Sequence, residues 1–555
     1  MKKDELIGIM NAKFIHFKKL ILIIFLITGA FSSIQAQVWV KSFTAGGYDS
    51  NNKLLGGSEV LQLISHKKIL FASVGYWQDA SNIWYGGSNN SIGWGQINRL
   101  DNPSAIWKQD LFLGASYLRP EILKQIIFTK DQFGNALSSP DTVLICAGYS
   151  PNYITSQVKV NSFVRNDVNG TWEESQIVQG IFPAGENYSI RDIEMYVDQQ
   201  TGFEYVFATV GTQGIFKGKY NPTNPGKIDW ISIAEFGPLS IRSLGIEVAN
   251  GKLYFSSGSK LYRRIDGFSP SYVIDHDFSD LGATINSAVG GIRGLTTIDN
   301  PNGTDEAFLL MWCPNGQSQG VIYRLEPDSG GFNRIYETKL SLLIEDFLFG
   351  SNVNYVLGAY NEFYKYIDPI TNDTLHLLGF EANITGGPHL TWNGYYKGSL
   401  FAKRYSDGQY LIEEINGAID LVDKALVANR CYVESPFPNE ISLYFGGFDP
   451  NSNSSTNMAW VFKKDYQLSS TENFQKHITK ELVYPNPNTG VFFIDPKIPL
   501  NTIKKVQVLN LSGQLIYEVT TPKQHQINTE EMLSGAYIVV IKLDKSLLYS
   551  QIILE

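Results

Sequence analysis

The chain has 555 residues, of which 43% are hydrophobic and 13% aromatic, so it can form two or more domains with a large core. It holds 45 basic and 54 acidic residues, a net charge of −9. This balance argues against a nucleic-acid partner and against electrostatic docking to an anionic membrane, because both require a positive surface.

Residues 1–36 have the parts of a secretory signal peptide. A lysine-rich flank precedes the apolar stretch 20–31, and Ala36 is a small residue before an expected cut at Gln37. The stretch is too short for an anchor, since spanning needs about 20 residues, and we expect no transmembrane span in the mature chain. The leader has five lysines and two acidic residues, so the mature chain carries −12.

A two-strand pattern returns with variable spacing from about Val38 to Lys464. An apolar run ending in small residues is followed by an alternating strand that often carries Arg, Lys or Tyr. The eight clearest apolar runs are residues 69–75, 142–148, 205–211, 252–258, 307–312, 355–359, 399–403 and 441–447. Asn-Gly, Asp-Gly and Gly-Gly pairs between apolar runs are typical of hairpins.

We interpret each repeat as one blade of a β-propeller, and residues 37–464 hold seven or eight of them. The apolar runs fit inner strands that are packed on both faces where space narrows toward an axis. The alternating strands fit a more exposed position. A string of β-sandwich modules is the competing fold, but it would show low-complexity linkers, which this range lacks.

A Gly-, Asn- and Ser-rich insertion between strands of the first repeat, residues 75–95, is crowded with aromatic residues. A long polar insertion is expected at a face of the propeller. Exposed aromatic rings there suit stacking on sugar rings or on a protein partner, with packing at the rim of the blade as the alternative. The predicted ligand-binding residues are Trp77, Trp84, Tyr85 and Trp94.

No motif identifies a catalytic residue, a metal site or a cofactor site: Gly-x-Ser-x-Gly, His-Glu-x-x-His and phosphate-binding loops are all missing from the sequence. Asp275-His276-Asp277 is the densest ligand-like cluster, but alternate residues of an extended strand cannot converge, so a solvated turn is expected. Acids around a propeller axis are the remaining possibility, with surface positions as the alternative for each. The candidates are Asp192, Glu194, Asp229, Glu345, Asp346 and Glu413.

The three cysteines, Cys146, Cys313 and Cys431, do not indicate a disulfide framework. An exported protein held by disulfides would show an even and denser set. Cys146 and Cys313 lie in or after apolar runs without a nearby His, so we expect small buried hydrophobes rather than a catalytic thiol.

The polar stretch 465–481 is predicted to be a linker, and residues 482–555 follow with their own strand pattern. The prolines of Tyr484-Pro485-Asn486-Pro487 require a turn. About six or seven strands are expected in this range, which predicts a small β-sandwich. The expected fold is therefore all-β, a propeller followed by a C-terminal sandwich.

Three spaced motifs in residues 482–555 resemble the C-terminal sorting domain of the type IX (Por) secretion system. They are Tyr484-Pro485-Asn486-Pro487 with Gly490, residues 508–514 with Gly513, and residues 533–539 with Gly535 and Tyr537. The resemblance implies that the outer-membrane translocon reads this domain. It also implies that the domain is often removed as cargo is released or attached to surface lipopolysaccharide. An ordinary β-sandwich binding module is the alternative.

The sequence thus predicts an exported or surface-attached protein whose propeller binds a glycan or a protein. One rival hypothesis is an extracellular propeller hydrolase or lyase acting on polysaccharide, and another is a structural surface component. Two or three carboxylates converging on the central pit would favour the hydrolase, whereas an aromatic platform without acids would favour binding.

Overall fold

The computed structural model describes two compact units, residues 39–466 and residues 482–554. Within these ranges it does not describe residues 76–94, 115–116, 118, 153–154, 156, 182–187, 288, 317, 348–351, 359, 370, 385–399, 416–427, 439, 449–457, 497, 511–514, 530–531 and 544–546. The predicted signal peptide, most of the predicted linker and several predicted site residues therefore lie outside the described residues. These site residues are Trp77, Trp84, Tyr85, Trp94 and Gly513.

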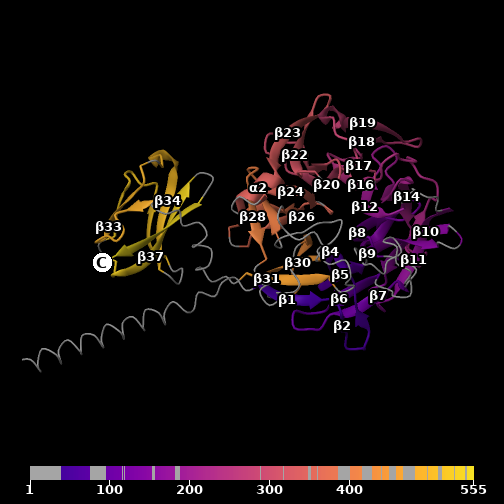
Figure 1. Ribbon diagram of the computed structural model, residues 1–555, viewed down its shortest axis with the longest axis horizontal. Coiled ribbons are helices and arrows are strands. Elements are labelled where there is room, and N and C mark those ends of the chain that lie inside the picture. The colour runs from indigo at the N-terminus through magenta and orange to yellow at the C-terminus, as the bar shows by residue number, and fades with distance from the viewer. Residues whose placement is uncertain are drawn as a thin grey trace, which may run out of the picture. The chain divides into compact units, whose positions relative to one another are not determined.

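The larger unit contains seven antiparallel sheets arranged around a common centre (Figure 1). The first three blades are β4 (Glu59–His66), β5 (Ile69–Gly75), β6 (Gln96–Leu100) and β7 (Lys108–Phe112); β8 (Ile122–Lys130), β9 (Ala136–Asn152), β10 (Gln157–Arg165) and β11 (Trp172–Ile181); and β12 (Ile190–Val197), β13 (Glu204–Val210), β14 (Gly214–Tyr220) and β15 (Ile228–Trp230). In each of them the strands follow one another in sequence order.

The next three blades are β16 (Ser243–Ala249), β17 (Lys252–Ser257), β18 (Lys260–Ile265) and β19 (Ser271–Asp277); β20 (Gly291–Ile298), β21 (Ala307–Cys313), β22 (Val321–Asp328) and β23 (Gly331–Lys339); and β24 (Val353–Gly358), β25 (Tyr364–Ile367), β26 (Thr374–Ile384), β27 (Leu400–Tyr405) and β28 (Tyr410–Glu414). The connections include the short elements η4 (Ser279–Leu281), α2 (Leu340–Phe347), β2 (Gly47–Tyr48) and β3 (Leu54–Leu55).

The seventh blade joins the two ends of the unit. Its strands are β29 (Ala428–Glu434), β30 (Ser442–Phe448), β31 (Trp460–Asp465) and, from the start of the chain, β1 (Trp39–Thr44). β1 pairs antiparallel with β31, with Trp39 opposite Lys464 and Thr44 opposite Trp460. Backbone hydrogen bonds therefore close the ring, which protects strand edges that would otherwise be open.

Most of the apolar runs form the second strand of a blade, so the prediction that they lie next to the axis is wrong. β21 and β30 are buried along their whole length because neighbouring blades cover both faces. The hydrophobic core accordingly lies between blades; one cluster, for example, joins the second blade to the third. The first strand of each blade is the one next to the axis, and these strands line a central cavity.

The sixth blade explains why the sequence shows eight apolar runs for seven blades. Two of the runs, 355–359 and 399–403, belong to this one blade, in β24 and β27. β24 and β25 pair with different halves of the long strand β26, with Val353 opposite Ile384 and Tyr364 opposite Leu377. The first strand is therefore split in two, which imitates an additional repeat.

Tight turns set the register of the hairpins that the sequence indicated. Asn250 and Gly251 connect β16 to β17 with φ angles of 52° and 66°, and Ala249 lies opposite Lys252. Two consecutive left-handed residues form the turn whose twist matches a two-residue hairpin, and Asn-Gly is the pair that adopts it with least strain.

The C-terminal unit is a small β-sandwich of seven described strands. One sheet contains β32 (Val483–Tyr484), β33 (Val491–Ile494) and β36 (Gln526–Asn528). The other contains β35 (Leu515–Thr520), β34 (Ile503–Asn510), β37 (Gly535–Leu543) and β38 (Leu547–Leu554), and η6 (Leu500–Thr502) precedes β34. Phe492, Val506 and Val539 are buried in a common core. The predicted all-β fold, a propeller followed by a sandwich, is confirmed. No helix among the described residues is long and apolar enough to cross a bilayer.

Candidate functional site

An axial cavity of about 560 Å³ is lined by the first strands of the blades. Every blade contributes to its wall, through Gln62, Lys124, Asp192, Glu247, Thr296, Glu362 and Arg430 in chain order. An axis filled with apolar side chains would leave no such space. Because the cavity is open and its lining is polar, we take it as the candidate site. Its charged side chains divide into two groups.

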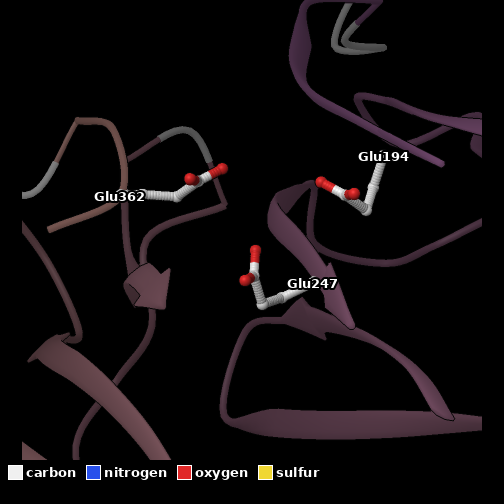
Figure 2. Close-up of side chains that lie close together, drawn as sticks. All are labelled: Glu194, Glu247 and Glu362. Carbon is white, nitrogen blue, oxygen red and sulfur yellow. The ribbon is translucent and has the colours of Figure 1, made fainter. Parts of the chain in front are cut away.

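We call the first group the carboxylate end: Lys124, Asp192, Glu194, Glu247 and Glu362. The Lys124 ammonium lies 2.6 Å from Glu194, 2.9 Å from Glu362 and 3.3 Å from Asp192. Figure 2 shows the carboxyl groups of Glu194, Glu247 and Glu362 facing a common space, and their nearest oxygens lie within 4.8 Å of one another. These side chains come from β8, β12, β16 and the stretch between β24 and β25.

Burial and mutual repulsion change the protonation of these groups. Burial raises the pKa of Asp192 to about 7, and burial followed by the proximity of Glu362 raises the pKa of Glu247 well above its usual range. Burial favours the neutral form of Lys124, but Asp192 and Glu194 outweigh it and raise the pKa of the amine. Lys124 is therefore charged at neutral pH, while part of the acidic charge is lost to protonation.

The Glu194, Glu247 and Glu362 carboxylates have the oxygen chemistry that Ca²⁺ or Mg²⁺ prefers. The Lys124 ammonium, however, already contacts two of the three groups. A divalent cation placed among them would lie against this positive charge. We therefore assign no metal to the carboxylate end and derive no chemistry through one.

We call the second group the arginine end: Arg119, Arg191, Arg242, Arg293 and Arg430. These residues lie at or just before the beginning of β8, β12, β16, β20 and β29, and three of them, Arg242, Arg293 and Arg430, are at most 6% exposed. Five blades thus place one arginine each at a comparable position. This equivalence brings the five side chains together at the start of the first strands.

Two buried carboxylates compensate part of this positive charge. Arg119 donates to Glu59 over 2.7 Å and to Glu121 over 3.1 Å, and Arg430 donates to the other oxygen of Glu59. The second oxygen of Glu121 accepts a hydrogen bond from the backbone of Ile190. Each oxygen of Glu59 and Glu121 therefore accepts one hydrogen bond from Arg119, Arg430 or the backbone.

Arg191 and Arg242 have no carboxylate partner among the described residues. Arg242 donates one hydrogen bond, to Ser189 over 3.3 Å, and the guanidinium of Arg191 makes none; both Nε atoms are buried without a partner. Burial, followed by the proximity of Arg119, lowers the pKa of Arg191 to about 10. Burial and Arg191 lower the pKa of Arg242 well below its usual range. The arginine end holds uncompensated positive charge.

Tyr360 and Glu381 complete the arginine end. The Tyr360 ring lies 3.8 Å from the Arg430 guanidinium and 4.9 Å from that of Arg293, and its hydroxyl donates to Glu381. The other Glu381 oxygen is buried without a partner. Burial raises the pKa of Glu381 to about 7, so this carboxyl group is only partly ionised at neutral pH.

Of the acids considered from the sequence, the structure places Asp192 and Glu194 at the axis and the others elsewhere. Asp229 accepts from Asn221 and Asn224 beside the outer strand β15. Glu413, on the outermost strand β28, pairs with Lys403 and Lys464. Glu345 and Asp346 lie on α2.

The histidine cluster and the cysteines form no site among the described residues. Asp275 pairs with Arg263, while Asp277 accepts from the backbone of Ser279, so neither converges with His276. These three residues end strand β19 rather than forming the expected turn. The three cysteines are buried, which confirms the expectation for Cys146 and Cys313, and Cys431 is a buried residue of the cavity wall.

Sequence reasoning did not identify the arginines or Lys124. The available signal was their position: Lys124, Arg191, Arg293 and Arg430 each lie in the strand that precedes an apolar second strand. A buried strand rarely contains a lysine or an arginine, so such a residue in the first strand of a blade indicates a side chain that faces the axis.

The sorting residues lie at the edge of the C-terminal sandwich. Tyr484 is exposed and stacks on Phe493, and Pro485 and Pro487 are exposed beside it. The Asn486 side chain accepts a hydrogen bond from Ile553, so this motif fastens the last strand, β38. Gly490 donates to the side chain of Asn488, Gly535 begins β37, and the Tyr537 hydroxyl donates to Leu533.

Residues 482–555 match the family model described as the secretion system C-terminal sorting domain, so this unit is a sorting domain. It implies export through that secretion system, with release or attachment at the outer-membrane surface. No curated protein matches the chain.

Solved structures similar to the chain include the Fusarium graminearum α-L-arabinofuranosidase Arb93A, at 11% identity over 76% of this chain and 96% of that one, with a TM-score of 0.33. They also include a Penicillium chrysogenum α-L-arabinanase, at 11% identity over 77% and 97%, with a TM-score of 0.33. Chaetomium thermophilum Sqt1 matches at 8% identity over 93% and 98%, with a TM-score of 0.37. The propeller assignment rests on the sheet order of this chain itself.

Proposed function

We propose that the chain is an exported protein whose propeller binds a saccharide in its axial cavity. The observation that supports this proposal is the polar, charged lining contributed by all seven blades. Carboxylates accept hydrogen bonds from sugar hydroxyls, and guanidinium and ammonium groups donate them. The prediction that the aromatic insertion stacks on a ligand or contacts a protein ligand is separate from this proposal. Its residues are Trp77, Trp84, Tyr85 and Trp94.

The proposed route has two signals: residues 1–36 direct passage across the inner membrane, and Tyr484, Gly490, Gly513, Gly535 and their neighbours are read by the translocon. Deleting residues 482–555 should leave the protein in the periplasm, whereas deleting 1–36 should leave it in the cytoplasm. Fractionation followed by immunoblotting measures both outcomes. Normal surface delivery of the chain without 482–555 would contradict the route.

Binding can be tested with the full chain on a polysaccharide array, read for retention and for new reducing ends. Glu362 is 39% exposed at the cavity, so Glu362→Gln removes the negative charge and replaces one of two acceptor oxygens with a donor, with little effect on packing. We expect this variant to lose saccharide retention and Asp305→Asn, at an exposed site, to keep it. Equal retention by both variants would place the ligand elsewhere.

Polysaccharide hydrolysis is the second candidate, favoured by the separation of the three glutamates. Retaining glycosidases place two carboxyl groups about 5 Å apart, and the oxygens here lie within 4.8 Å. Glu247, whose pKa is raised by burial and then by Glu362, would be the general acid, and Glu194 or Glu362 the nucleophile or base. Loss of the acid typically slows such reactions about 10²- to 10⁴-fold.

New reducing ends that disappear in Glu247→Gln while retention persists would establish the hydrolase. Retention without new ends in the unsubstituted chain would exclude hydrolysis of that polysaccharide and leave binding. A structural surface component would show neither property on any saccharide.

A further inference from the structure

The charge of the arginine end indicates which chemical class of saccharide the axial cavity would bind, an inference that rests on the proposed function. We propose that the arginine end of the axial cavity binds an oxyanion, the carboxylate or sulfate group of an acidic sugar. Arg191 and Arg430 line the cavity directly, with Arg242 and Arg293 beside them. The planar guanidinium fork matches both oxyanions in geometry and in charge.

The hydrogen-bond partners of the five arginines differ, and they show which guanidinium groups are free to bind a ligand. Arg119 and Arg430 are paired with Glu59, and Arg293 donates to the backbone carbonyls of Gly358 and Val289. Arg191 makes no hydrogen bond to a described residue. Arg242 is only 6% exposed and makes a single long one. Arg242 is buried and Arg191 is partly buried, and a cation withdrawn from water without a full counterion is unfavourable, so binding of an anion would be favourable.

The described carboxyl groups supply only part of this counter-charge: burial and the neighbouring arginines outweigh Glu121, which favours the charged forms of Arg191 and Arg242. Glu59 and Glu121 are already bonded to Arg119, Arg430 and the backbone. Burial raises the pKa of Glu381 to about 7, so this group is only partly ionised at neutral pH, and one of its oxygens accepts from Tyr360. The remaining negative charge is therefore not supplied by the described residues. The cavity gives an anion from outside access to Arg191 and Arg430.

The two ends of the cavity also restrict where the acidic group lies on the ligand. Arg191 and Glu194 are three residues apart on β12, and because a bulge lies between Ile190 and Ile193, their backbones are at most roughly 10 Å apart. A second acidic sugar next to the first would approach the carboxylate end and be repelled. The expected ligand carries its acidic group beside neutral sugars rather than in an unbroken acidic run.

Two matched pairs of probes test this class by titration calorimetry on the full chain. One pair is glucuronic-acid-substituted xylo-oligosaccharides and the same oligosaccharides with the carboxyl group reduced to an alcohol. The other is κ-carrageenan oligosaccharides and their desulfated form. We expect one acidic member to bind at least about 10-fold more tightly than its neutral partner, as a charged hydrogen bond predicts. The preferred pair identifies the oxyanion.

Arg191→Gln and Arg242→Gln should abolish the preference for the acidic member, while Arg334→Gln on β23, far from the axis, should keep it. Binding of both members of a pair with equal affinity would overturn the inference and leave the proposed function intact. Binding of neither member of either pair would count against both.

Thermal melting without ligand separates a binding role from a structural one. If Arg191 awaits an anion, Arg191→Gln removes uncompensated charge, and the variant should melt at a higher temperature than the unsubstituted chain. Sodium sulfate should raise the melting temperature of the unsubstituted chain more than sodium chloride at equal ionic strength, and in the variant this excess should shrink to the general stabilisation that sulfate gives to folded proteins. A lower melting temperature of Arg191→Gln together with an unchanged sulfate effect would overturn the proposal.

Discussion

The two ends of the axial cavity hold opposite excess charge and relieve it in different ways. At the carboxylate end, Lys124 contacts Asp192, Glu194 and Glu362, and the raised pKa values of Asp192 and Glu247 let protons neutralise part of the remainder. At the arginine end, Glu59 accepts hydrogen bonds from both Arg119 and Arg430, and Glu121 accepts one from Arg119. The pKa of Arg191 is still about 10. A carboxylate with a raised pKa takes up a proton near neutral pH, whereas Arg191, with a pKa of about 10, keeps its charge there. The arginine end is therefore the part of the cavity that needs a ligand.

The largest expected effect comes from removing the counterion of the carboxylate end. Lys124→Met leaves four acids around an apolar side chain and should lower the free energy of unfolding by about 2–4 kcal/mol, as the loss of one partner of a buried ion pair does. The loss should be greater at pH 8 than at pH 5, because protonation of Asp192 near pH 7 relieves the repulsion.

Denaturant unfolding at the two pH values measures this difference. Lys252→Met, at an exposed position at the start of β17, is the matched control and should change little. If Lys124→Met were no less stable than the control at pH 8, the carboxylate end would not depend on its lysine.

The next largest effect tests whether Glu381 is neutral at the arginine end. Its pKa in the folded state, about 7, is above its ordinary value, so Glu381 lowers stability progressively as pH rises from about 4.5 through 7. Glu381→Gln keeps an acceptor for Tyr360 and should be more stable than the unsubstituted chain by roughly 2–3 kcal/mol at pH 8, with no gain at pH 4. Melting curves across this range measure the slope.

An ionised Glu381 paired with the arginines would give the opposite sign at pH 8, a loss of stability in Glu381→Gln. That outcome would show that the arginine end neutralises itself and needs no anion.

A smaller gain is expected when positive charge is removed from the arginine end. Arg242→Gln should raise the free energy of unfolding by about 1 kcal/mol, because it removes a buried cation that has one long hydrogen bond. Denaturant unfolding in chloride buffer measures it. A loss of more than about 1 kcal/mol would mean that Arg242 is held by the fold itself rather than awaiting a partner.

The smallest effect on stability is expected at the rim of the carboxylate end. Glu362→Gln should change the free energy of unfolding by less than about 0.5 kcal/mol, since the side chain is partly exposed and Lys124 keeps Glu194 and Asp192. The same unfolding experiment measures it. A large loss would show that all the carboxylates are needed to hold Lys124.

The sequence was most informative where one local pattern determines structure. The apolar second strands, such as β21 and β30, and the Tyr484-Pro485-Asn486-Pro487 turn can be recognised from consecutive residues. The first strands cannot, because a bulge between Ile190 and Ile193 interrupts the alternation of β12, so that the neighbouring residues Arg191 and Asp192 both line the cavity.

The candidate site could not be predicted because its residues come from different blades. Lys124 and Glu362 are 238 positions apart, and only ring closure through β1 and β31 brings the first strands into one circle. In the sixth blade the first strand is split, and the sequence pattern of this one blade was therefore counted as two repeats. Of the six acids considered from the sequence, Asp192 and Glu194 lie at the axis, and only the closed ring distinguishes them from Asp229 and Glu413.

The central claim, that the axial cavity is the ligand site, is tested most directly by hydrogen–deuterium exchange of the full chain with and without the acidic xylo-oligosaccharide. The account predicts slower exchange in peptides that cover residues 190–194 and 430–433. Protection confined to residues 76–94, which contain Trp77, Trp84, Tyr85 and Trp94, would contradict it and place the ligand on the aromatic insertion.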